Sequence, residues 1–174
     1  MQFDIKHITD HAHHATNELL TRAKTHGLDQ DFVAEFGPGL EFKVFISPTQ
    51  VNMAIICPEL STWLKTFFTS SEEGEEMNEF EKDFFGCVYD FASDKELFTA
   101  VDHIETRMWI NSDETSHSPD AIFFAYADVA TDYQNTNWEE LELVLRSGYG
   151  VMLMAHMWLA NRHKALQVEV PVVC

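Results

Sequence analysis

The longest apolar stretch of the chain lies near its C-terminal end. Residues 151–160 are apolar on every side except at His156. A helix that is apolar all round must be surrounded by other elements. The pattern therefore predicts a central helix over residues 138–166, around which a single hydrophobic core forms.

Two local features of the sequence bear on where this central helix begins and on its regularity. Asn137 and Glu140 have the spacing of a capping box, which favours a helix beginning at this point. Gly148 and Gly150 interrupt its interior, where each glycine costs about 1 kcal/mol relative to alanine. We expect either a kink or a close backbone contact at these glycines.

Apolar residues also recur at helical spacing in other parts of the chain. Together with capping residues and helix-stopping glycines, this spacing predicts helices over residues 9–26, 29–36, 58–68, 77–92, 96–108 and 121–133. The last of these ranges is compatible with a buried strand as well, because residues 121–127 are almost continuously apolar.

Strict alternation of apolar and polar positions appears in two neighbouring runs. Residues 40–46 and 51–57 have this period of two and are separated by a Ser-Pro-Thr-Gln segment, so they predict an antiparallel hairpin with one buried face. Residues 168–173 are rich in valine but contain Pro171, which suits an edge strand beside the hairpin. The fold expected is α+β and predominantly α-helical, with about six helices around the central one.

The length of 174 residues and the 45% apolar content fit one globular domain over residues 1–174. No signal peptide is recognisable, because the N-terminal residues lead into polar, histidine-rich sequence. No stretch has the roughly 18 apolar residues of a membrane span. We therefore expect a soluble, cytoplasmic protein. Three cysteines without a CxxC pair indicate neither a disulfide framework nor a thiolate zinc site.

The formal charge of the chain is −18, and it is unevenly distributed. Residues 72–142 contain 20 acidic and 3 basic side chains and thus account for −17 of this charge. We call this range the acidic band. Such a field repels nucleic acid and acidic membranes and attracts basic protein surfaces. Direct binding of nucleic acid through a basic patch is excluded.

One group of residues near the N-terminus resembles a metal site in its spacing. His7, His11, His14 and Glu18 fall on one face of the helix predicted over residues 9–26 and its N-terminal extension. Imidazoles one helical turn apart can share a zinc ion, and Glu18 could add an oxygen ligand. The alternative is a histidine-rich surface without a metal, since His13 lies on the other side of the helix and no HExxH motif is present.

The other candidate catalytic residues have little support from the sequence. A buried His156 would need a hydrogen-bond partner, and a carboxylate there would raise its pKa and make it a catalytic candidate. Ser147 does not lie in a GxSxG motif, and Cys87 falls near the apolar stripe of its helix, where thiols are usually inert. Neither glycine pair has the spacing of a phosphate-binding loop. The sequence predicts no catalytic residue.

The acidic band is the remaining functional signal, and it favours a non-enzymatic interaction protein. Carboxylates one or two helical turns apart can occupy positions that nucleic-acid phosphates take in a basic groove. Small acidic inhibitors use this device, among them phage anti-restriction and anti-CRISPR proteins and immunity proteins of nuclease toxins; the likeness is one of physical type only. The contacts are expected from Glu72, Glu73, Glu75, Glu76, Glu79, Asp83, Asp113, Glu114 and Asp120.

The expected partner is a basic protein surface, such as that of a nuclease or another nucleic-acid-binding complex, with no direct contact to nucleic acid or membrane. Two alternatives remain open. The first is a small metal-dependent enzyme that uses zinc at His7, His11, His14 and Glu18. The second is a structural or assembly subunit whose acidic face only keeps it soluble.

Overall fold

The computed structural model describes residues 5–47, 50–67, 78–92, 107–110, 121–128 and 136–169. In chain order these ranges contain α1 (Ile5–His26), β1 (Asp31–Gly37), β2 (Leu40–Ile46), β3 (Gln50–Ile56), α2 (Pro58–Phe67), α3 (Glu79–Ala92), β4 (Arg107–Ile110), β5 (Ala121–Asp128) and α4 (Trp138–Glu169). The predicted α+β class with a majority of helix is confirmed. The prediction of about six helices is wrong for the described part of the chain, which contains four.

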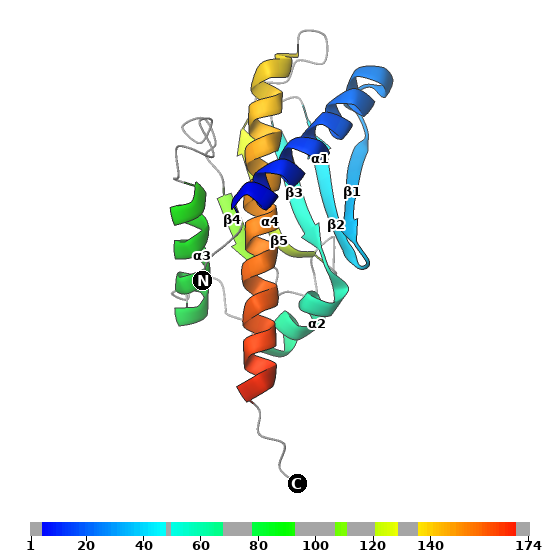
Figure 1. Cartoon of the computed structure of the whole chain (residues 1–174). Helices are drawn as coiled ribbons and strands as arrows, with labels where there is room; N and C mark the ends of the chain where they lie inside the picture. The colour runs from blue at the N-terminus through cyan, green and yellow to red at the C-terminus, as the bar shows by residue number, and fades with distance from the viewer. Residues whose placement is uncertain are drawn as a thin grey trace.

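The strands form one antiparallel sheet with the order β1-β2-β3-β5-β4. The predicted hairpin is β2 and β3, and its alternation is visible in the burial of Phe42, Val44 and Ile46 beside the more exposed Lys43 and Phe45. The same inward face of the sheet continues through Val51, Met53 and Ile55 of β3. In Figure 1, α1 and α4 lie across this side of the sheet.

Residues 31–36 were predicted to be helical and instead form β1. Phe32 is buried while Asp31 and Glu35 are exposed, which is the alternation of a strand. Pro38 and Gly39 make the tight turn into β2, and Gly39 has a φ of +72°, a conformation that glycine adopts without steric cost. Gly37 therefore precedes a hairpin turn and does not end a helix.

Two further predictions of helices are corrected at the far side of the sheet. Residues 107–108, assigned to a helix from their spacing, belong to β4, which pairs with β5 from Arg107↔Tyr126 to Ile110↔Phe123. Residues 121–128 form β5, in agreement with the strand alternative and not with the helix. β5 pairs with β3 on one side and with β4 on the other, and its residue Ile122 is fully buried. The predicted helical residues 96–106 lie outside the described residues.

The central helix is confirmed as α4. Its first turn is capped as predicted, because the backbone N–H of Glu140 donates to Asn137 Oδ1 over 3.3 Å. With 32 residues, α4 spans about 48 Å and runs the length of the molecule, with α3 on one side and α1 crossing it (Figure 1). Residues 168 and 169 are part of α4, so the strand predicted over 168–173 is wrong at its start. Residues 170–173 are not described.

Candidate functional site

Helix α3 is the part of the acidic band that the structure describes most fully. Its inner side packs on α4, with the rings of Phe80 and Phe84 5.1 and 5.3 Å from Trp158, measured between centroids. Phe80, Phe84 and Val88 are buried. This packing determines which side of α3 faces solvent.

The solvent-facing side of α3 carries carboxylates. Glu79, Asp83 and Asp90 are exposed, and the side chain of Glu79 is 92% accessible. Glu79 lies 3.7 Å from the ammonium of Lys82, an exposed pair that leaves the carboxylate in water. We call Glu79, Asp83 and Asp90 the α3 acidic face. Two of the predicted contact residues, Glu79 and Asp83, are therefore one helical turn apart on one outward face.

The other seven predicted contact residues lie outside the described part of the chain: Glu72, Glu73, Glu75, Glu76, Asp113, Glu114 and Asp120. The proposal that all nine carboxylates share one surface stays a prediction.

Exposed carboxylates also occur outside the acidic band, on strand β1. Asp31 and Glu35 of β1 are exposed on the strand at the end of the sheet. They were missed because residues 29–36 were interpreted as a helix, in which positions 31 and 35 would simply be one turn apart. The alternation of Phe32, Ala34 and Phe36 with these acids was the signal that could have located them.

The N-terminal histidines form the contacts that helical spacing predicts. The rings of His7 and His11 are 4.2 Å apart between centroids, and His11 also approaches Phe36 of β1. His11, His14 and Glu18 line a groove of about 490 Å³ between α1 and β1. Within the described ranges, no three His, Cys, Asp or Glu side chains are placed to hold one metal ion. The zinc hypothesis gains no geometric support from this face.

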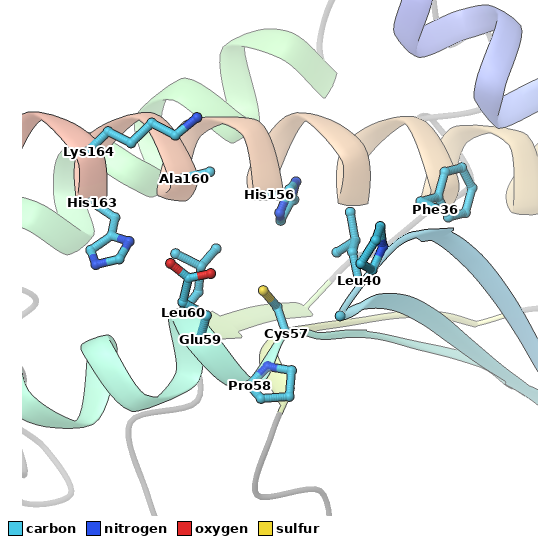
Figure 2. Close-up of a pocket in the computed structure, with 12 residues that line it drawn as sticks. Phe36, Leu40, Cys57, Pro58, Glu59, Leu60, His156, Ala160, His163 and Lys164 are labelled. Atoms are coloured by element: carbon cyan, nitrogen blue, oxygen red, sulfur yellow. The ribbon is translucent and has the colours of Figure 1, made fainter.

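A second pocket, of about 570 Å³, lies between the β1–β2 turn, the start of α2 and the C-terminal half of α4. Cys57 and His156 both line it, with Glu59 and His163 (Figure 2). Burial raises the pKa of the Cys57 thiol above its ordinary value, although backbone N–H groups of Leu60 and Glu59 oppose the shift. A thiol held in its protonated form is a poor nucleophile.

The alternative in which a carboxylate raises the pKa of His156 and makes it a catalytic candidate finds no support, because the pKa of this residue is lowered. Burial, and then the charge of Lys164, lower the pKa of His156 from 6.5. His156 is therefore neutral at physiological pH and occupies the pocket as a half-buried apolar residue would. Ser147 is only 4% exposed, so a substrate could not reach its hydroxyl. Neither Cys57 nor His156 is therefore activated for catalysis in this pocket.

Comparison of the chain with protein-family models, with curated proteins and with solved structures gives no match. Among the helices that the structure describes, none combines the length and apolar character needed to cross a membrane.

Proposed function

We propose that this protein is a non-enzymatic interaction protein, an acidic inhibitor or antagonist that binds a basic surface of a partner protein. The partner surface is one that otherwise binds nucleic acid, and carboxylates of the acidic band take the place of phosphates. The observation that carries the proposal is the α3 acidic face, where apolar packing on α4 directs Glu79, Asp83 and Asp90 outward.

The packing of α3 favours a role of its carboxylates in partner binding over a role confined to the helix itself. Glu79 and Asp83 are separated by one turn of a helix that Phe80, Phe84 and Val88 hold on α4, so their backbone positions are fixed. The β-carbons of residues one helical turn apart are about 6 Å from each other, so the two carboxylates start from positions that repeat at a regular interval, as phosphates do along a nucleic-acid strand. The partner would meet an ordered array of charge.

The experiment compares two charge reversals of equal size. Glu79→Lys with Asp83→Lys reverses two of the three charges of the α3 acidic face, while Asp29→Lys with Glu59→Lys changes the net charge equally at exposed positions outside the acidic band. Each tagged variant is used to capture proteins from a lysate of its own organism at low and high salt. Circular dichroism establishes that all three proteins are folded.

The proposal predicts that wild type and the control variant capture the same basic protein, and that the α3 variant loses it. Capture should weaken as salt rises, because exposed charge pairs are screened over about 8 to 10 Å. Equal capture by the α3 variant and the control would exclude the α3 acidic face as the contact. Capture that salt does not change would exclude charge as the cause of binding.

A further inference from the structure

Among the strands that the structure describes, β1 forms one end of the sheet and has a neighbour only on its β2 side. It is seven residues long, whereas β4 at the opposite end has four. An edge strand presents N–H and C=O groups that another chain can pair with. β1 is thus the longer of the two available edges among the described strands.

The hydrogen-bond pattern of the hairpin shows which β1 residues point outward. The N–H of Ser47 donates to the carbonyl of Gln50 over 2.8 Å, so the pair next to the β2–β3 loop is hydrogen-bonded. Bonded and non-bonded pairs alternate along an antiparallel ladder. The alternation turns the backbone groups of Val44 and Phe42 toward β1, where they meet Phe32 and Ala34. The groups of Asp31, Val33 and Glu35 therefore point away from the sheet.

An independent contact supports this assignment. Arg22 of α1 donates a hydrogen bond from Nη1 to the carbonyl of Val33 over 3.3 Å, which requires that this carbonyl point outward. The guanidinium also lies 5.6 Å from the centre of the Phe32 ring. Arg22 thus binds the outward carbonyl of Val33. The outward backbone N–H and C=O groups of Asp31, Val33 and Glu35 follow one another about every 7 Å along the strand.

A groove of about 490 Å³ adjoins this strand. The α1–β1 groove, lined by His11, His14, Ala15 and Glu18 on one side and residues 33–36 on the other, runs along the same strand. A strand added to β1 would turn alternate side chains into this groove and the remaining ones onto the open side of the sheet.

The charges along the edge select the occupant. If two copies of β1 paired antiparallel about Val33, Asp31 of each would lie opposite Glu35 of the other. Like charges in directly opposed positions are destabilising. A segment with lysine or arginine at those positions would instead be attracted to Asp31 and Glu35, whose side chains are exposed on the open side of the sheet.

We infer that the outer edge of β1 binds an extended, basic segment of a partner protein by strand addition. The segment has basic residues at alternate positions, opposite Asp31 and Glu35, and small or apolar residues between them that enter the α1–β1 groove. The inference uses the preference for basic partners stated in the proposed function, but it assigns a different surface from the α3 acidic face.

The probe is a fluorescent octapeptide of alternating lysine and valine, with a glutamate–valine octapeptide as its acidic counterpart. Binding is followed by anisotropy. Val33→Pro removes one outward N–H without removing a β1–β2 hydrogen bond, and Val33→Ala is its matched control because it keeps the N–H. Val33→Pro should weaken binding of the lysine peptide about tenfold or more, whereas Val33→Ala should change it less than about threefold.

Charge and position are tested separately. Asp31→Lys with Glu35→Lys should abolish binding of the lysine peptide and produce binding of the glutamate peptide. Glu79→Lys with Asp83→Lys should leave lysine-peptide binding unchanged, so loss of the α3 contact and loss of the β1 contact are distinguishable.

Failure to bind the lysine peptide, or equal binding by Val33→Pro and Val33→Ala, would overturn the inference. Should Val33→Pro prove unfolded by circular dichroism, a lysine–valine peptide N-methylated along one edge replaces it. Binding by that peptide as strong as by the unmethylated one would indicate simple charge attraction and likewise overturn strand addition.

Discussion

Gly148 of α4 lies directly against the side chain of Met53 of β3. A β-carbon at position 148 would overlap the sulfur and methyl atoms of Met53. Met53 is itself only 3% exposed, so it has little room to move away. The glycine in the middle of the central helix is therefore explained by close approach of the helix to the sheet.

Gly148→Ala should lower the free energy of unfolding by about 1 kcal/mol. Alanine gains about 1 kcal/mol of helix propensity, but forcing Met53 out of place costs about 1 to 3 kcal/mol. In a Met53→Ala background the overlap is absent, and the same substitution should become stabilising. Urea unfolding of the four proteins of this double-mutant cycle measures the coupling. Additive effects would show that the contact with Met53 does not determine the choice of glycine.

Thr16 of α1 is fully buried, and among the described residues its hydroxyl has no hydrogen-bond partner. Thr16→Val keeps the shape and removes the unsatisfied group, so it should stabilise the protein by about 1 kcal/mol. Thr21→Val is the control, because the hydroxyl of exposed Thr21 donates to the Asn17 carbonyl over 2.8 Å. Thermal unfolding should show a gain for the first variant only. A loss of stability in Thr16→Val would reveal a bond that the structure does not contain.

His156 should make the stability of the protein depend on pH. Because its pKa is lowered in the folded state, the unfolded chain takes up a proton first as the pH falls below 6.5. The contribution of His156 is thus fully retained above that pH and is lost as the pH falls toward the folded pKa. His156→Gln should lose less stability than wild type between about pH 7.5 and 5.5. Identical pH profiles would show that burial does not hold His156 neutral.

The zinc hypothesis can be tested without reference to activity. Because no three ligands converge in the described ranges, dialysis against micromolar zinc should leave no stoichiometric metal on the protein. Elemental analysis of wild type and of His11→Ala with His14→Ala should give equal values. One zinc per chain in wild type, lost in the double variant, would restore the metal-dependent enzyme as the leading alternative.

Some elements of this fold could be predicted because their residues contact the core in a simple local pattern. The β2–β3 hairpin alternates strictly, and α4 is capped by Asn137 and is apolar on every side over residues 151–160 except at His156. Residues 121–127 of β5 are almost continuously apolar and show no period of two, so their sequence fits a helix as well as a strand. β4 is too short, with four residues, to show a period.

The α3 acidic face and the β1 edge also differ in whether the sequence could predict them. Phe80, Phe84 and Val88 have helical spacing and form the buried side of α3. The outward position of Glu79 and Asp83 follows from that spacing, so it could be predicted from local sequence. The β1 edge could not, because it depends on the pairing of β1 with β2 and on the placement of α1 beside it. The acid residues of β1 also lie outside the acidic band that the charge count had identified.

The central claim is that the acidic protein occupies a nucleic-acid-binding surface of its partner, and competition with DNA tests it most directly. The basic protein captured by wild type is loaded with fluorescent double-stranded DNA, and the acidic protein is titrated in. The account predicts that wild type releases the DNA and that Glu79→Lys with Asp83→Lys does not. A stable complex in which the partner holds the DNA and the acidic protein together would contradict it.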